Sequence, residues 1–325
     1  MCTPVAGASD GLRETRVSLK RLDLLASCLA AALVCLSGCG QPAQPPAAAS
    51  GQASSAAPQP DQAKGSLAWA VAGDWRIPAW TARDPARHPA ETLAFFGVKG
   101  SDTVVELWPG GGYYTAILGP YLKAGGGHFI AAQMDAAPEN ASALDAFGKA
   151  FVAKPDIYGP IQVTTASKTA AEIAPAGSAD VVLTFRNIHN WMSEGYADKI
   201  FADAFKALKP GGVFGVEEHR LPSRGEQDPN ASNGYVKEAY VIQLAEAAGF
   251  KLEGKSEINA NPKDKADHPL GVWMLPPTLR TPAPGSELAK TYNADIYKAI
   301  GESDRMTLKF RKPAASPAPP APATP

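Results

Sequence analysis

The stretch Val104-Val105-Glu106-Leu107-Trp108-Pro109-Gly110-Gly111-Gly112-Tyr113-Tyr114 decides the fold of this chain. Its apolar residues up to Leu107 predict a buried strand that includes one acidic residue, and the three glycines predict a tight turn. A helix is expected to follow from about Tyr114 to Leu122. A strand, a glycine turn and a helix N-terminus in succession are typical of a nucleotide-binding edge, because glycine lets the backbone approach a ligand closely.

Composition and charge narrow the classes of protein to which this chain can belong. Its 325 residues can bury one sizeable core, or two. With Lys+Arg 31 and Asp+Glu 32, the formal net charge of -1 gives no electrostatic case for binding nucleic acid. The four cysteines all lie at or before Cys39, so neither a disulfide nor a thiolate metal site is expected in the folded part.

Residues 1–39 have the pattern of a targeting segment. Basic residues precede the apolar run 24–36, which is short for a membrane span and typical of a signal sequence. The run ends in Leu36-Ser37-Gly38-Cys39, which resembles the lipobox of bacterial lipoproteins. This resemblance implies that Cys39 is lipidated and that the protein is anchored in the cell envelope, facing the periplasm, with this lipid as its only contact with the membrane. The alternatives are an uncleaved N-terminal anchor and a mis-set start codon.

Segments rich in small residues and proline lie on either side of the expected domain. Residues 40–65 consist mostly of Pro, Ala, Ser and Gln, with too few large apolar residues to form a core, so a disordered linker is expected. Residues 313–325 form a similar Ala/Pro tail. The folded domain is therefore predicted over 66–312, and it begins with an N-terminal helical cap.

Short apolar segments alternate with helical patterns across this domain. Strands are expected at 103–107, 128–133, 161–165, 180–184 and 212–217, and helices at 89–96, 197–208 and 235–248. Two further strands, 250–259 and 306–311, flank a Pro-rich segment with one helix at about 287–300. The pattern predicts an α/β fold, a doubly wound, Rossmann-like, seven-stranded sheet that is mostly parallel with an antiparallel last strand.

Three segments give a specific resemblance to a known family. Val104-Val105-Glu106 with Gly110 and Gly112 is similar to the first motif of the class I S-adenosylmethionine (SAM)-dependent methyltransferases. Asp180-Val181-Val182-Leu183 resembles their fourth-strand motif, and Leu208-Lys209-Pro210-Gly211-Gly212 resembles the turn before their fifth strand. Other segments resemble one bacterial family of predicted methyltransferases, and these are 106–112, 185–191, 218–220, 259–262 and 301–306.

The resemblance implies SAM as the cofactor. SAM carries no phosphate, so its site needs close backbone approach rather than a cationic cradle. The sequence lacks the Gly-Lys-Ser/Thr of a phosphate-binding loop, and 110–115 does not fit the Gly-x-Gly-x-x-Gly of a dinucleotide site. The predicted cofactor-binding residues are Glu106, Trp108, Gly110, Gly111, Gly112, Gln133, Asp135 and Asn187.

Two positions depart from the family's pattern. Trp108 stands where the first glycine is usual, and Pro109 stiffens the turn that follows. An acidic residue usually ends the second strand and holds the ribose, and here that position falls on Gln133, with Asp135 two residues later. The sequence leaves open which of the two binds the ribose, and Gln133 would do so without the charge of a carboxylate.

Polar residues follow the fourth and fifth strands at the carboxyl edge, where open α/β sheets bind ligands. His189 is a candidate general base, because an imidazole exchanges protons near neutral pH, but its polar side chain can equally satisfy loop backbone groups. The predicted catalytic residues are His189, Glu218 and His219, and the predicted contacts to a small-molecule substrate come from Tyr114, Arg186, Trp191 and Arg220. The catalytic residues show no local metal-ligand spacing, so no metal is expected.

Two functions from different classes fit these observations. The first is a SAM-dependent methyltransferase acting on a small or medium-sized substrate, in which catalysis is mostly positioning and no catalytic triad is required. The second is an envelope-anchored ligand-binding or scaffold protein whose methyltransferase fold no longer methylates, because a lipoprotein signal would export the domain from the cytoplasm where SAM is made. A nicotinamide-dependent oxidoreductase fits less well because of the glycine spacing.

Overall fold

The computed structural model describes residues 62–314. The predicted signal segment, the lipidation at Cys39 and most of the linker and tail lie outside the described residues. Within the described part of the chain, no helix has both the length and the apolar character needed to cross a bilayer.

One sheet organises the domain, with the strand order β3-β2-β1-β4-β5-β8-β7. Its strands are β1 (Thr103–Leu107), β2 (His128–Gln133), β3 (Ile161–Thr165), β4 (Ala179–Phe185), β5 (Leu208–Leu221), β7 (Lys251–Ser256) and β8 (Arg305–Arg311), and a short β6 (Val236–Lys237) pairs with β5 off this path. Strands β1 to β5 pair in parallel, whereas β8 runs antiparallel to both β5 and β7. The predicted doubly wound sheet with a reversed last strand is therefore confirmed.

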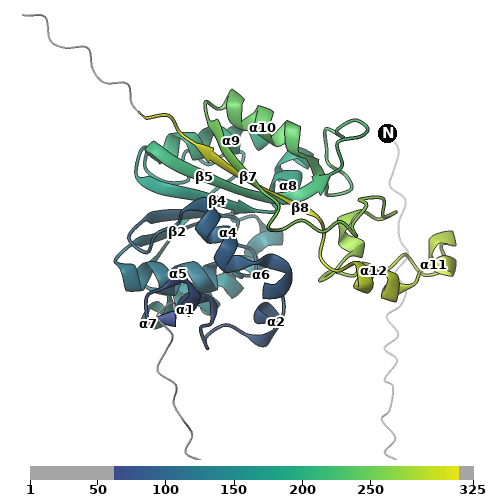
Figure 1. Ribbon diagram of the computed structural model, residues 1–325, viewed down its shortest axis with the longest axis horizontal. Coiled ribbons are helices and arrows are strands. Elements are labelled where there is room, and N and C mark those ends of the chain that lie inside the picture. Colours follow the sequence, from purple (N-terminus) through teal and green to yellow (C-terminus); the bar gives the residue numbers. More distant parts are fainter. Residues whose placement is uncertain (1–61, 315–325) are drawn as a thin grey trace, which may run out of the picture. The chain divides into compact units, whose positions relative to one another are not determined.

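Helices cover both faces of the sheet (Figure 1). One face carries α8 (Ile188–Ser193), α9 (Ala197–Ala207) and α10 (Glu238–Ala247), and the other carries α1 (Leu67–Val71), α4 (Pro89–Phe96), α5 (Thr115–Gly125) and α7 (Pro155–Tyr158). Side chains alternate along β1, so that Val105 and Leu107 pack on the α8–α9 side and Val104 packs on the α5 side. This two-sided burial explains why the strands read as short, apolar runs.

The remaining elements lie before β1, between β2 and β3, and between β7 and β8. They are α2 (Pro78–Thr81), α3 (Asp84–Arg87), η2 (Pro138–Asn140), α6 (Ala141–Phe147), the π-helical η3 (Gly148–Val152), η4 (Val272–Met274), α11 (Glu287–Thr291) and α12 (Ala294–Ile300). The expected N-terminal helical cap is thus formed by α1 to α4. Its tryptophans are packing residues, as shown by the contact of Trp69 with Trp75 and by Trp80 stacked on Phe151.

Several element boundaries differ from the sequence-based expectation, and β5 extends over Leu208–Leu221 rather than 212–217. The single helix predicted over 287–300 is two helices, because Asn293 has an extended backbone and its side chain accepts a hydrogen bond from the backbone N–H of Asp295, as an N-cap does. The helix predicted from 235 begins only at Glu238, since Val236 pairs with the end of β5. Strand β7 is shorter than 250–259 and ends at Ser256.

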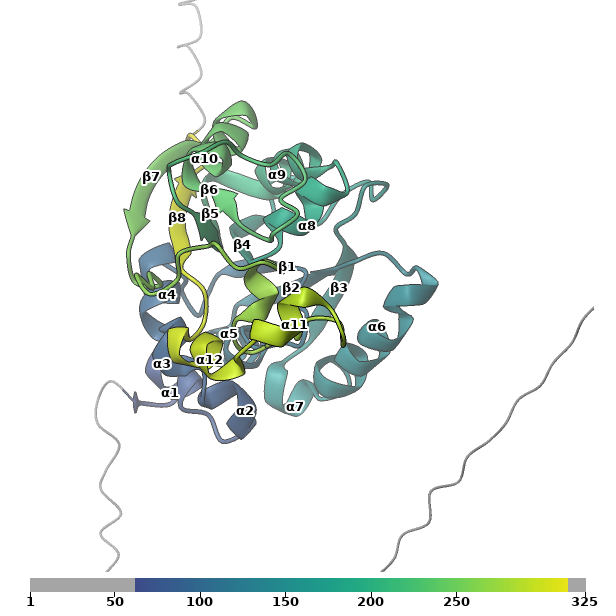
Figure 2. The ribbon, with the colours of Figure 1, turned by 90° about the vertical axis from the view of Figure 1, so that its right-hand side faces the viewer.

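The segment between β7 and β8 crosses the carboxyl edge of the sheet, the edge at which β1, β2, β4 and β5 end. Figures 1 and 2 both show α11 and α12 standing outside this edge. Arg220 lies near the end of β5, and its backbone N–H donates to the carbonyl of Asp304. This hydrogen bond fixes the end of the crossing segment. The carboxyl edge is therefore covered from one side by residues far away in the sequence.

Candidate active site

The turn after β1 has the backbone that the glycine pattern predicts. Gly110 and Gly112 have left-handed φ angles of 58° and 81°. A Cβ at Gly112 would lie 2.1 Å from the Phe151 ring, so only glycine fits there, whereas a Cβ at Gly111 would meet no atom within 4 Å. The turn is thus held closely against η3 at Gly112 and leaves an open cradle at Gly111.

Trp108 has a backbone conformation that is usual only for glycine. Its φ is 46°, in the left-handed region that side chains rarely adopt, and its backbone N–H donates to the carbonyl of Ala132 at 2.8 Å. The indole Nε1 donates to the carbonyl of Ala166 at 2.7 Å, and the ring makes an edge contact with Trp191. The indole ring of Trp108 therefore lies across the ends of β2 and β3.

Glu106 lies beneath the turn rather than on an open surface. It is 2% exposed, and the hydroxyl of Thr115 donates to its Oε2 at 2.7 Å, which ties β1 to the start of α5. Burial raises the pKa of Glu106 to about 8, against the hydrogen bond from Thr115 and the charge of Arg186, which act to lower it. Glu106 is therefore protonated at neutral pH, and the cofactor contact predicted for it stays a prediction.

Gln133 and Asp135 have different surroundings at the end of β2. Gln133 is 5% exposed, and its buried Nε2 has no hydrogen-bond partner among residues 62–314. Asp135 is exposed and accepts a hydrogen bond from the side chain of Asn140 at 3.0 Å. A buried amide without a partner is costly, so Gln133 has a polar group available to a ligand, and the ribose contact of Gln133 or Asp135 stays a prediction.

The residues after β4 connect this strand to its neighbours β1 and β5 at the carboxyl edge. Arg186 also has a left-handed φ, of 60°, and its guanidinium pairs with Glu217 of β5 at 2.9 Å. The side-chain Nδ2 of Asn187 donates to the carbonyl of Leu107 at 2.9 Å, which ties the end of β4 to the end of β1. Strained backbone at both Trp108 and Arg186 marks this edge as a place where geometry is imposed by the surroundings.

His189 and Glu218, both predicted as catalytic, are in direct contact. The Nδ1 of His189 lies 3.0 Å from Oε1 of Glu218, whose two oxygens also accept the backbone N–H groups of Ile188 and His219 at 2.6 and 2.8 Å. Because a carboxylate only accepts hydrogen bonds, the Nδ1 of His189 carries the proton in this contact. The Nε2 of His189 has no hydrogen-bond partner among the described residues, so it is the nitrogen left to act on a ligand.

The ring of His219 lies next to that of His189, with centroids 5.4 Å apart. The Nδ1 of His219 contacts the hydroxyl of Ser303 from the crossing segment. Burial, and after it the charges of His189 and Arg186, hold the pKa of His219 well below its usual range, so its ring is neutral at physiological pH. The three predicted catalytic residues are thus brought together on one edge.

Ligand atoms of His189, Glu218 and His219 lie within 4.8 Å of one another, close enough for a metal ion. No spacing in the sequence indicates this, because the residues come from the ends of two different strands. Both oxygens of Glu218 are already occupied by hydrogen-bond donors. That arrangement favours Glu218 as the group that orients His189 over Glu218 as a metal ligand.

The predicted substrate contacts do not all face open space. Trp191 is fully buried, and Tyr114 is buried with its ring stacked on Phe185 and its hydroxyl donating to Glu217. Arg220 forms bidentate pairs with Glu257 and Asp304 that use all three of its nitrogen atoms. The substrate roles of these three residues stay predictions. Two of the four have nitrogen atoms without a hydrogen-bond partner among the described residues, Arg186, which uses only one Nη, and Trp191, whose Nε1 is buried.

Sequence reasoning gave little weight to two residues that the structure places at this edge. Arg87 of α3 and Glu302, just before β8, pair at 3.0 Å. Glu302 belongs to the segment 301–306, one of those on which the resemblance rests, whereas Arg87 lies outside all of them. Their partnership has no signal in one sequence, because the two residues are 215 positions apart.

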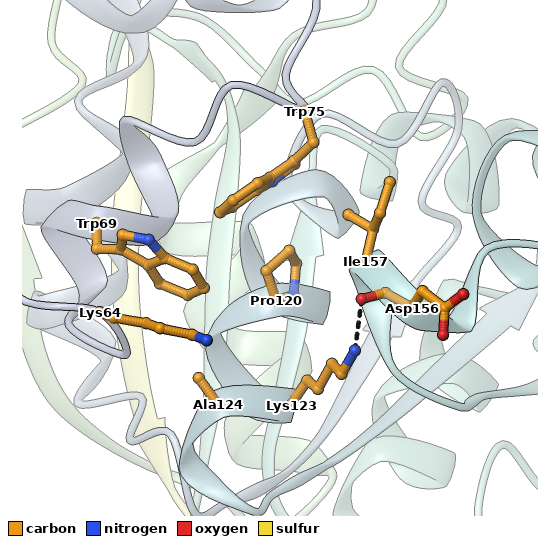
Figure 3. Close-up of a pocket in the computed structure, with 8 residues that line it drawn as sticks. All are labelled: Lys64, Trp69, Trp75, Pro120, Lys123, Ala124, Asp156 and Ile157. Carbon is orange, nitrogen blue, oxygen red and sulfur yellow. Dashed lines mark hydrogen bonds between the residues drawn. The ribbon is translucent and has the colours of Figure 1, made fainter.

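The surface has one groove beside the glycine turn and a larger hollow farther from it. A groove of about 210 Å³ lies between Gly110 and Gly111 and the apolar face of α6 and η3. A larger hollow of about 560 Å³ lies away from the carboxyl edge, between α1, α5 and α7, with Trp69 and Trp75 on one side and Lys123 and Asp156 on the other (Figure 3). The groove at the glycine turn lies next to predicted cofactor-binding residues, and a further hollow of about 560 Å³ is lined by Arg220 and Asp304 near the end of β5.

These observations test whether the residues fit SAM. The open cradle at Gly111 and the unpartnered buried amide of Gln133 fit the close backbone approach and the ribose contact of a nucleoside. The groove beside the turn is lined by apolar side chains of α6 and η3. The residues fit the cofactor, with Trp108 as the one bulky departure.

Comparisons with known proteins found similar solved structures and no other match. No protein-family model matches the sequence, and neither does any curated protein. The chain is similar to a solved SAM dependent methyltransferase from Aquifex aeolicus, with a TM-score of 0.44 and 15% identity over 71% of this chain and 93% of that one. It is also similar to a putative sarcosine dimethylglycine methyltransferase from Galdieria sulphuraria, with a TM-score of 0.44 and 14% identity over 71% and 85% of the two chains. A third similar structure is the [4+2]-cyclase SpnF, with a TM-score of 0.44 and 15% identity over 75% and 85%.

Proposed function

We propose that this protein is a SAM-dependent methyltransferase acting on a small or medium-sized substrate. One observation carries the proposal, the presence on a single edge of an open glycine turn, an unpartnered amide at Gln133 and a histidine held by a carboxylate. The first two suit a nucleoside, and the third suits removal of a proton from a nucleophile.

Each residue then has a defined task. The backbone at Gly110 and Gly111 and the side chain of Gln133 would hold the nucleoside, and the bound cofactor would supply an electrophilic methyl group. The Nε2 of His189 would take the proton from the attacking group of the substrate, while Glu218 keeps Nδ1 protonated. Because methyl transfer is a direct displacement, most of the rate enhancement would come from positioning.

The test is calorimetric titration of the full chain with S-adenosylhomocysteine, the demethylated cofactor. The Cβ of Gly111→Leu would meet no atom within 4 Å, so the variant should keep the fold while its side chain occupies the cradle and abolishes binding. Gly148→Leu is the matched control, because a Cβ there also meets no atom within 4 Å and the site lies outside the turn. Absence of binding by the wild type, or equal binding by both variants, would reject the proposal.

The bulk of Trp108 favours a second candidate function. A tryptophan in the place of the usual glycine, held by Ala166 and Trp191, is also what a fold retained for binding alone would tolerate. An exported, lipid-anchored domain would suit this role as a ligand-binding or scaffold protein. The two functions separate if the full chain binds a nucleoside but transfers no labelled methyl group to any fraction of a small-molecule extract.

A further inference from the structure

A group of arginines surrounds two glutamates at the carboxyl edge. Glu302 accepts hydrogen bonds from Arg83 at 2.7 Å, from Arg87 at 3.0 Å and from Arg305 at 3.1 Å. Glu217 pairs with Arg186 at 2.9 Å and with Arg305 at 3.3 Å. We call this group the arginine cluster; its members are Arg83, Arg87, Arg186, Arg305, Glu217 and Glu302.

The arginine cluster carries an excess of positive charge. Four guanidinium groups share two carboxylates. The nearby Glu106 does not compensate, because burial raises its pKa to about 8 and leaves it neutral at pH 7. Uncompensated charge is costly in a buried position, so such a cluster is stabilised by an anion.

Arg87 and Arg186 have nitrogen atoms to spare. Arg87 is 3% exposed and uses only its Nε toward Glu302, so neither of its Nη atoms has a hydrogen-bond partner among the described residues. Arg186 uses only one Nη toward Glu217. Since a guanidinium presents its donors as a planar fork, the spare atoms are suited to the two oxygens of a carboxylate.

The surroundings place both arginines beside the glycine turn. The guanidinium of Arg87 stacks on the ring of Tyr113, 4.6 Å from its centroid, and Tyr113 directly follows Gly112. Glu217 accepts hydrogen bonds from both Arg186 and Tyr114, the residue after Tyr113. Burial, and after it repulsion by the charge of Arg186, lowers the pKa of Arg87 to about 9. An anion between them would relieve this repulsion.

We propose that Arg87 and Arg186 together bind a carboxylate group of a ligand at the carboxyl edge. The proposal rests on the proposed function for the identity of the ligand but not for the anion site itself. Two sources share this chemistry, the amino-acid end of SAM and a carboxylate on the methyl acceptor. Arg87, from the N-terminal cap, is thereby assigned to ligand binding.

The first experiment compares S-adenosylhomocysteine with 5′-methylthioadenosine, which has the same nucleoside and no carboxylate. Each is titrated calorimetrically into the full-length wild type, Arg87→Gln and Arg83→Gln. If the carboxylate is the cofactor's, Arg87→Gln weakens S-adenosylhomocysteine at least tenfold and leaves 5′-methylthioadenosine unchanged. Arg83→Gln, which removes the same charge from the same carboxylate but from a more exposed residue, should alter neither.

The second experiment identifies an acceptor carboxylate by using malonate as the probe. Malonate at constant ionic strength should raise the melting temperature of the wild type and not that of Arg87→Gln or Arg186→Gln. Arg87→Lys, which keeps the charge but not the fork, should lose most of the malonate response and is the variant to use if Arg87→Gln does not fold. Equal responses of wild type and variants to both S-adenosylhomocysteine and malonate would overturn the proposal. If malonate discriminates but neither nucleoside binds, the anion site stands and the proposed function fails.

Discussion

Glu218 holds the imidazole of His189 through the 3.0 Å contact between Oε1 and Nδ1, and its other oxygen accepts the backbone N–H of Ile188 at 2.6 Å. One buried carboxylate thus fixes both the ring and the start of the helix that carries it. Orientation of a histidine by a carboxylate is a common feature of sites in which the free ring nitrogen acts on a ligand.

Replacement of Glu218 by Gln is expected to lower kcat about tenfold to a hundredfold, with KM changed much less. The glutamine amide can present its N–H group to Nδ1, which permits the ring proton to move to Nε2 and blocks proton acceptance there. Methyl transfer measured as a function of substrate concentration separates the two constants. Glu257→Gln is the control, because Glu257 pairs with Arg220 at the same edge but has a side chain that is 69% exposed.

A metal ion held by the same residues would give a different result. Dialysis against a chelator would then reduce activity as much as the Glu218→Gln change does, and added Zn²⁺ would restore it. We expect the chelator to leave the activity unchanged.

The strained backbone at Trp108 gives a prediction about stability. Trp108→Ala should lower the free energy of unfolding by about 3 kcal/mol through loss of the partly buried ring and its hydrogen bond. Trp108→Gly should cost about 1 kcal/mol less than the alanine change, because glycine adopts a φ of 46° without strain. Urea unfolding measures both values.

At Trp108 the alanine variant is expected to cost more than the glycine variant. The control for this order of the two costs is Trp80, which lies within α2 and stacks on Phe151. There the backbone is helical, so glycine should be worse than alanine by about 1 kcal/mol. The same order at Trp108 as at Trp80 would contradict the strain argument.

How far the sequence predicts this protein depends on the range of each interaction. The strands and the turn at Gly110 and Gly112 follow from local patterns, because apolar runs and glycine positions are set by neighbours in the chain. The approach of His189 to Glu218 follows one step later, since His189 comes just after β4, Glu218 lies near the end of β5, and the ends of parallel strands share an edge. The detail that Glu218 accepts from Nδ1 needed the structure.

Other features have no local signal. The pairing of Arg87 with Glu302 joins an N-terminal helix to the final hairpin, and nothing in either segment specifies the other. The protonated state of Glu106 arises from burial that only the packed sheet creates. The break between α11 and α12 depends on the capping side chain of Asn293, which a helical periodicity over 287–300 does not reveal.

Glu302 gives a prediction for acid stability. Burial acts to raise its pKa, but the charges of Arg87 and Arg305 and the hydrogen bond from Arg83 outweigh this and lower the pKa to about 2. A carboxyl whose pKa falls on folding stabilises the protein above its unfolded pKa of 4.5, and that stability is lost as the pH drops toward 2. Glu302→Gln should therefore cost about 2 kcal/mol at pH 7 and progressively less as the pH falls below 4.5.

Glu253 is the comparison for this measurement. Its pKa is also lowered to about 2, chiefly by the hydrogen bond from Arg311, but its side chain is 34% exposed. Solvent and salt screen such a pair, so Glu253→Gln should have a smaller effect that vanishes in high salt. Equal losses of unfolding free energy for the two variants would show that burial of Glu302 does not strengthen its ion pairs.

Glu106 should show the opposite dependence on pH. Its pKa is raised on folding, mainly by burial, from 4.5 to about 8, so the folded protein keeps a proton that the unfolded chain releases. The contribution of Glu106 to the free energy of unfolding is therefore greatest below pH 4.5, decreases as the pH rises from 4.5 toward 8, and levels off above that. Glu106→Gln removes the ionisable group and keeps an oxygen to accept the hydrogen bond from Thr115. The variant should match the wild type near pH 5 and exceed it by about 2 kcal/mol or more at pH 8, as measured by urea unfolding at each pH. A difference that stays constant between pH 5 and pH 8 would mean that Glu106 is ionised in the folded protein, and its carboxylate would then be available to the cofactor after all.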